Sequence, residues 1–250
     1  MNNQDTLFTV DQYMKQFGLD KLPLLNAPAI LVFNKDMFEQ LKALSSEENK
    51  PNKQSIMDFF NLRLTNRSIR VFLSGDGSVS AAFTLALLAR RGITGIIGIG
   101  YSVSLVPDEL KIGDYFLPYS SIRYDGASQC YLSKEIPVVV NPLTLARVYS
   151  IITRKNVTHF GLSYCTDSYF HLKRDDVRGK NVMSLDMESG AFLTVTEINS
   201  IPSVLINIIA EEINHNGEWK VDYPKARNSL KQLTEMLPEI LTNIVRQTHE

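Results

Sequence analysis

Short apolar runs alternate with amphipathic stretches along most of the chain. The apolar runs predict buried strands, and segments with an apolar residue every three to four positions predict helices. The expected strands span residues 29–33, 57–64, 69–73, 95–100, 114–118, 120–124, 157–164 and 202–210. The expected helices span residues 11–17, 79–91, 142–155, 186–199 and 224–246, and another begins after Asn34. This alternation predicts a single α/β domain over residues 1–250 with a mixed, largely parallel sheet.

Polar segments separate some of these elements. Residues 45–54 are polar and predict a surface loop, and residues 65–67 predict a turn between two strands. Residues 1–14 are a candidate loose N-terminal segment. The glycine-rich turn at 74–78 lies between a strand and an apolar helix, where backbone N–H groups can face an anion. Glycine serves tight turns equally often, so both roles stay open for this turn.

Composition narrows the classes of function. The chain has 250 residues, with 26 Lys and Arg against 27 Asp and Glu, and its net charge of −1 argues against nucleic-acid and membrane-surface binding. No apolar run approaches the ~18 residues needed to cross a bilayer. The two cysteines, Cys130 and Cys165, indicate a reduced, cytoplasmic protein, and the four histidines show no metal-ligand spacing. We therefore expect a small-molecule partner, with no metal and no cofactor.

Two acidic groups follow apolar strands. Glu188, in the sequence Asp186-Met187-Glu188-Ser189, opens a predicted helix. An acidic residue there can simply favour the helix dipole, or its two acceptor oxygens can bind the vicinal hydroxyls of a sugar. Glu211 follows the strand at 202–210, where ligands bind in open α/β sheets, although a plain surface position is equally compatible.

Several segments, in order, resemble the nucleoside phosphorylase family, and most closely its uridine phosphorylase members. They are 71–80 (VFLSGDGSVS), 99–114 (IGYSVSLVPDELKIGD), 122–128 (IRYDGAS), 159–170 (HFGLSYCTDSYF) and 186–189 (DMES). The resemblance extends over about residues 15–245. It implies a three-layer α/β/α sandwich that cleaves nucleosides at the N-glycosidic bond, usually with phosphate as the nucleophile. It also implies a homo-oligomer, either a dimer or a hexamer.

The resemblance assigns roles at the sugar end of the expected site. It implies that Glu188 holds the ribose hydroxyls, that Met187 packs on the sugar and that Tyr169 stacks on the base. The candidate substrate-binding residues are Met187, Asp186, Tyr169, Lys173, Arg174, Tyr101 and Gly100.

The base end matches the family less closely. Lys173, and either Arg174 or Asp175, fall near the family's base-reading residues, beside a one-residue deletion. Glu211 occupies the stretch where purine-cleaving members keep a catalytic acid, which makes it a candidate proton donor toward a purine. The sequence leaves the identity of the base open.

The segments that hold phosphate in the family depart from its pattern. Arginines bind phosphate there through paired, charge-assisted hydrogen bonds. In this chain Met37, Met57 and Gly98 stand at the arginine positions. Phe33 replaces a glycine, and Tyr101 replaces the phosphate-binding threonine. We therefore expect a degenerate phosphate site at these positions.

Three functions remain open. The first is a nucleosidase, in which water replaces phosphate and Asp36 or Glu39 positions the water. The second is a noncatalytic nucleoside-binding paralogue. The third is a phosphorylase whose anion site is rebuilt from Lys35 and the turn at 74–78. The candidate catalytic residues are Glu188, Asp36 and Glu211.

Overall fold

The computed structural model describes residues 7, 9–21, 24–45, 57–64 and 67–245. The predicted loop at 45–54 and the predicted turn at 65–67 lie almost entirely outside these residues. Within them the strands form one mixed sheet in the order β2-β3-β1-β4-β7-β6-β5-β8-β9. The strands are β1 (Ala29–Val32), β2 (Phe59–Leu64), β3 (Arg67–Leu73), β4 (Ile96–Ser104), β5 (Tyr115–Tyr124), β6 (Thr158–Thr166), β7 (Val182–Asp186), β8 (Ser203–Ile213) and β9 (Trp219–Val221).

The sheet bends back on itself because β4 has more than two partners. β4 pairs in parallel with β1 and β8, and its end pairs antiparallel with β7. β8 also pairs antiparallel with β5, and β5, β6 and β7 are joined by parallel pairs. The pairings β4-β7-β6-β5-β8-β4 therefore close a ring, and the ends of β4, β7 and β8 meet on one side of it.

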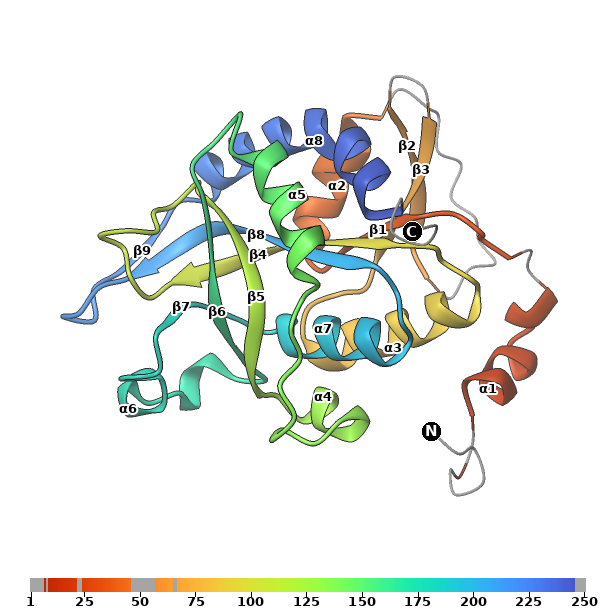
Figure 1. Ribbon diagram of the computed structural model, residues 1–250, viewed down its shortest axis with the longest axis horizontal. Coiled ribbons are helices and arrows are strands. Elements are labelled where there is room, and N and C mark those ends of the chain that lie inside the picture. The colour runs from red at the N-terminus through yellow and green to blue at the C-terminus, as the bar shows by residue number, and fades with distance from the viewer. Residues whose placement is uncertain (1–6, 8, 22–23, 46–56, 65–66, 246–250) are drawn as a thin grey trace.

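Helices cover both faces of the sheet (Figure 1). One face carries α2 (Lys35–Ala43), α5 (Pro142–Ile152) and α8 (Tyr223–Val245), and the other carries α3 (Ser78–Arg90), α4 (Gly126–Tyr131) and α7 (Ser189–Ile198). The shorter helices are α1 (Val10–Gln16), η1 (Leu19–Lys21), η2 (Tyr169–His171) and α6 (Arg174–Val177). This arrangement confirms the predicted α/β fold with a mixed sheet between helical layers. In the described part of the chain, no helix has the length and apolar character that a membrane span requires.

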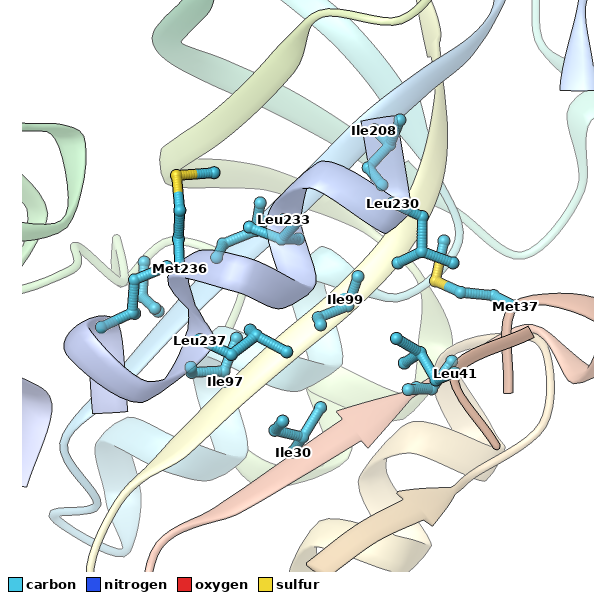
Figure 2. Packing of buried hydrophobic residues seen from close by; sticks show 14 of the residues in the cluster. Ile30, Met37, Leu41, Ile97, Ile99, Ile208, Leu230, Leu233, Met236 and Leu237 are labelled. Carbon is cyan, nitrogen blue, oxygen red and sulfur yellow. The ribbon is translucent and has the colours of Figure 1, made fainter. Parts of the chain in front are cut away.

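The core beneath α2 and α8 follows from their apolar spacing (Figure 2). The apolar residues of α8 recur every three to four positions and lie against one face of the sheet. Burial of each large apolar side chain contributes about 1.5–3 kcal/mol to folding. Figure 2 shows the helix residues Met37, Leu41, Leu230, Leu233, Met236 and Leu237 packed on the strand residues Ile30, Ile97, Ile99 and Ile208.

Element boundaries near the carboxyl ends of the strands differ from the prediction. β4 continues to Ser104 and β8 to Ile213, so Glu211 lies inside a strand and not in the loop after it. The predicted helix at 186–199 begins only at Ser189, because Asp186 is the last residue of β7. In each case polar residues interrupt the apolar pattern at the point where the strand end forms a cavity.

Two further differences concern the middle of the chain. The runs at 114–118 and 120–124 belong to one strand, and a register shift beside Pro118 separates its two halves. The helix α4 was not predicted. Asp125 caps its N-terminus, and the carboxylate accepts hydrogen bonds from the backbone N–H and the hydroxyl of Ser128. An acidic residue followed by glycine is equally typical of a turn, so the local sequence did not distinguish a helix start from a turn.

The N-terminal helix α1 forms close to its predicted position. The Thr9 hydroxyl and the Gln12 side chain cap its first turn reciprocally. Tyr13 packs edge-on against Phe83 of α3, with ring centroids 5.3 Å apart. This end of the predicted loose segment is therefore in contact with the sheet-covering helices. The extent of the domain over residues 1–250 remains a prediction.

Candidate functional site

A cavity of about 170 Å³ lies at the carboxyl ends of β1, β7 and β8, beside the last third of β4. It is called the Glu188 cavity below. Its wall also receives residues from the turn before α3, from η2 and from the start of α8. The lining residues are Phe33, Asn34, Asp76, Tyr101, Ser102, Val103, Tyr169, Met187, Glu188, Glu211 and Tyr223. The cavity thus joins the adjacent residues Met187 and Glu188 with Tyr101, Tyr169 and Glu211, which come from separate parts of the sequence.

The backbone around Glu188 is fixed by Asp186. One carboxylate oxygen of Asp186 accepts the N–H groups of Glu188 (3.2 Å) and Ser189 (2.9 Å), and the other accepts the Asn207 amide (3.0 Å). Asp186 is 1 % exposed and does not line the cavity. Its bonds in the described structure go to the protein, and its predicted contact with substrate stays a prediction.

The Glu188 carboxylate is buried, with 8 % of the residue exposed. One of its oxygens accepts the backbone N–H of Gly77, at 2.6 Å, immediately before α3. Gly77 has a φ of +91°, a conformation that favours glycine. Burial, reinforced by the nearby charges of Asp186 and Asp76, raises the pKa of Glu188 from 4.5 to about 8. A carboxyl group in this state can donate as well as accept a hydrogen bond near neutral pH.

Glu211 is held from both sides by aromatic donors. The Tyr223 hydroxyl donates to one carboxylate oxygen at 2.8 Å, and the Trp219 indole N–H donates to the other at 2.9 Å. The Tyr223 ring meets Tyr101 edge-on, with centroids 5.2 Å apart. Burial raises the pKa of Tyr101 to about 12, and burial together with the charge of Glu188 raises that of Tyr169 well above its ordinary value. The tyrosines of this wall are therefore neutral hydrogen-bonding groups at neutral pH.

The space above two glycines of β4 is filled by aromatic rings. A Cβ atom on Gly100 would lie 2.9 Å from the Phe33 ring, and one on Gly98 would lie 2.8 Å from the Phe192 ring. The Phe33 and Phe192 rings pack edge-on, with centroids 6.0 Å apart. The region in which a longer side chain at position 98 would extend is thus occupied by apolar atoms.

The two methionines at arginine positions lie in the core. Met37 is fully buried under α8 (Figure 2), and Met57 is 5 % exposed in the cluster on the opposite face of the sheet. Neither lines the Glu188 cavity. Their side chains therefore contribute to packing.

Three of the predicted site residues do not line the cavity. The Asp36 carboxylate forms an ion pair with Arg227 of α8 at 3.1 Å and accepts the Gln40 amide at 2.6 Å. The Arg174 guanidinium donates to the His215 carbonyl at 3.1 Å and lines a separate cavity of about 590 Å³. Lys173 precedes α6 and lines neither cavity. The structure therefore does not join these residues to Glu188.

The described residues hold no group of three or more His, Cys, Asp or Glu side chains arranged to bind a metal ion.

Comparison with known proteins adds to this geometry. The model of the family described as "Phosphorylase superfamily" matches residues 29–246. The chain belongs to this superfamily. It is 25 % identical over 220 residues to uridine phosphorylase of Escherichia coli (strain K12), covering 78 % of this chain and 87 % of the relative. It is also 25 % identical over 141 residues to purine nucleoside phosphorylase of Plasmodium vivax, covering 54 % of this chain and 58 % of the relative.

Solved structures show the same fold. Purine nucleoside phosphorylase from Toxoplasma gondii, in complex with immucillin-H, matches with a TM-score of 0.76 at 18 % identity, over 89 % of this chain and 92 % of that one. Uridine phosphorylase from Vibrio fischeri matches with a TM-score of 0.67 at 18 % identity, over 87 % and 89 % of the two chains. The predicted resemblance to nucleoside phosphorylases is confirmed at the level of family and fold.

In this phosphorylase-superfamily chain, several residues that line the cavity were not among the predicted site residues. Asn34 was expected only as a helix cap, and it also donates to the Asp76 carboxylate at 3.2 Å. Asp76 lies in the glycine-rich turn already singled out, so that turn was the available signal. Nothing in the sequence marked Ser102 or Tyr223 as a site residue. Ser102 fits the alternation of a strand, and Tyr223 fits the start of a helix.

Proposed function

We propose that this protein binds a nucleoside through its pentose hydroxyls at Glu188 and cleaves the N-glycosidic bond, with water as the nucleophile. The superfamily and the named activities of the relatives support the reaction class. One observation supports water over phosphate as the nucleophile. The Glu188 cavity is lined by the carboxylates of Asp76, Glu188 and Glu211, and its described lining contains no lysine, arginine or histidine.

Phosphate does not suit such a wall. A phosphate dianion beside carboxylates needs cationic donors, and each charge-assisted hydrogen bond contributes about 1.5–3 kcal/mol. The Phe33 and Phe192 rings occupy the space over Gly98 and Gly100. One donor of the glycine turn is already used, because the Gly77 N–H binds Glu188. These contacts disfavour both the original phosphate site and a rebuilt one.

The cavity residues suit the separate parts of the reaction. Glu188 accepts the ribose hydroxyls, Met187 packs on the sugar and Tyr169 faces the base. Glu211 is the better candidate to take a proton from water, since Asp36 is held in its ion pair with Arg227. When the glycosidic C–N bond breaks, its electron pair stays with the base nitrogen, and the water oxygen bonds to the anomeric carbon. The proton that Glu211 takes from the water then passes through solvent to the base nitrogen, so one neutral nucleoside and one water give ribose and a neutral base.

Noncatalytic binding is the second candidate, and the size of the cavity favours it. Small-molecule pockets usually enclose ~300–1,000 Å³, whereas the Glu188 cavity encloses about 170 Å³. A site of this size encloses only part of a nucleoside, such as the pentose. The base then has to lie toward the cavity mouth, where η2 forms one wall.

The test is incubation of the protein with uridine, inosine, cytidine and adenosine, with and without inorganic phosphate, followed by chromatography for free base. Base released without phosphate supports the proposal. Release only with phosphate overturns the choice of water, and saturable binding without release supports the noncatalytic role. Glu188→Ala should lower nucleoside affinity at least about tenfold, because it removes both oxygens that would bind the pentose hydroxyls. Unchanged affinity would remove Glu188 from the site.

The match for the family's intersubunit arginine is Met57, which is buried in its own chain. A second copy therefore would not restore the missing cation through this position. We propose a homo-oligomer, in which the Glu188 cavity is complete without an arginine at position 57. Sedimentation velocity gives the oligomeric state, and a monomeric protein would overturn this part.

A further inference from the structure

We propose that the Glu188 cavity selects a nucleoside whose base carries a fixed positive charge, such as a ribosylated aromatic ring with a quaternary nitrogen. This inference rests on the proposed nucleoside binding and names its substrate class. It follows from the charge of the cavity wall, from its aromatic surfaces and from the buried hydroxyl of Ser102, which has no partner.

The charges of the wall have a single sign. Asp76 comes from the turn before α3 and Glu211 from β8, so two separate elements each supply a carboxylate. The Glu188 carboxyl, between β7 and α7, is a third acidic group, and its raised pKa of about 8 leaves it mostly uncharged at neutral pH. Arg227 acts electrostatically on Tyr101, but its guanidinium is bound to Asp36. The described lining residues therefore leave the acids without an opposing charge inside the cavity.

Aromatic rings complete the wall beside these acids. Tyr101, Tyr169 and Tyr223 line the cavity, and the Tyr223 hydroxyl is directed at Glu211. Aromatic faces attract cations through their quadrupole, and the attraction grows when the cation is desolvated. A carboxylate has about four acceptor positions. Glu211 keeps free acceptor positions after binding Tyr223 and Trp219.

Ser102 supplies an independent sign that a ligand belongs here. It is 3 % exposed, its hydroxyl has no hydrogen-bond partner, and it lines the cavity. A buried polar group without a partner is uncommon and costs free energy. A ligand in the cavity can supply the missing bond, and the surrounding acids select one that is rich in donors or positively charged.

A cationic base also suits a site without phosphate. When the glycosidic C–N bond breaks, its electron pair moves onto the quaternary nitrogen and the base leaves as a neutral molecule. The base then needs no proton from an acid. The water oxygen bonds to the anomeric carbon, and the water proton passes to the Glu211 carboxylate and then to solvent. The balance is one cationic nucleoside and one water giving one ribose, one neutral base and one proton.

The test compares two ligands of nearly equal size. Nicotinamide riboside carries a pyridinium cation, and its dihydropyridine form is neutral. We expect calorimetry to show the cation bound at least about tenfold more tightly, with the preference falling at high salt. If the cation is cleaved, a pH-stat should record one proton per base released.

Two variants distinguish an effect of the Glu211 charge from a general effect of substitution on the structure. Glu211→Gln should reduce the cation preference at least about threefold. Glu212→Gln should leave it unchanged, because Glu212 accepts the Ile112 N–H at 2.6 Å and does not line the cavity. If Glu211→Gln does not fold, the ratio of the wild-type affinities for the cationic and the neutral ligand still tests cation selection. Equal affinities would overturn cation selection while leaving nucleoside binding intact. Failure of both ligands and of uridine and inosine would overturn the proposed function itself.

Discussion

Replacement of Glu188 by glutamine should make the protein more stable, and increasingly so as the pH rises. The Glu188 carboxyl is buried beside Asp186, and this raises its pKa from 4.5 to about 8. Between these values the folded protein retains a proton that the unfolded chain has lost. Unfolding then releases a proton, so the free energy of unfolding falls as pH rises through this window. Each pKa unit corresponds to about 1.4 kcal/mol, so the full effect is roughly 5 kcal/mol.

Glutamine removes this penalty and keeps an oxygen that can accept the Gly77 N–H. We expect the difference in unfolding free energy between Glu188→Gln and the wild type to grow by about 4 kcal/mol from pH 5 to pH 9. The variant also relieves repulsion on Asp186, which acts in the same direction. Most proteins are stable by only about 5–15 kcal/mol, so the change is readily measured.

The assay is urea unfolding followed by circular dichroism at each pH unit from 5 to 9, on the wild type and the variant. Subtracting the two curves removes the titration of groups that the substitution does not touch. Glu197→Gln is the matched control, because Glu197 lies exposed on the same helix α7, and its difference curve should be flat. A flat curve for Glu188→Gln as well would show that the carboxylate is not desolvated, and the account of the site would be wrong.

Three further substitutions test the packing around the site. Gly98→Ala should lower the free energy of unfolding by about 1–3 kcal/mol, measured by urea titration, because the added Cβ would lie 2.8 Å from Phe192. Arg123→Met should lower it by about 3 kcal/mol or more, because the buried guanidinium donates to backbone carbonyls within 132–136, and a thermal melt would show the loss. Asp36→Asn should cost less than about 1 kcal/mol in the same melt, since its ion pair with α8 is half exposed.

The periodic parts of the fold could be predicted because their pattern is local. The apolar runs of β1, β3 and β6 and the amphipathic spacing of α8 predicted these elements to within a few residues. The prediction failed where strands run into the Glu188 cavity. There polar residues such as Ser102 and Glu211 replace the apolar pattern, although the backbone pairing between β4 and β8 continues. Sheet pairing depends on backbone groups, so the pattern of side chains does not show that a strand continues into a functional site.

The candidate site, like the fold, could be predicted only where its residues belong to short local motifs. Glu188, Met187 and Tyr169 came from short motifs, and the fold brings them together. Asp36 was expected near the site from the family resemblance, because it lies at the start of the helix beside the family's phosphate segment. Its ion pair with Arg227 joins residues 191 positions apart, and no local pattern predicts such a partner. Arg174 likewise binds the His215 carbonyl, which lies in another loop.

Position 33 connects the loss of the anion site with the chemistry of Glu188. The Phe33 ring lies over Gly100 and also lines the Glu188 cavity. An apolar ring in that place excludes both phosphate and water from one wall. With less water nearby, a charged carboxylate is less well solvated, and burial is the largest cause of the raised pKa of Glu188. Phe33 thus fills space over Gly100 and lines the same cavity as the buried Glu188. A cationic ligand there would lower the cost of ionising Glu188, and its cleavage by water would need no phosphate.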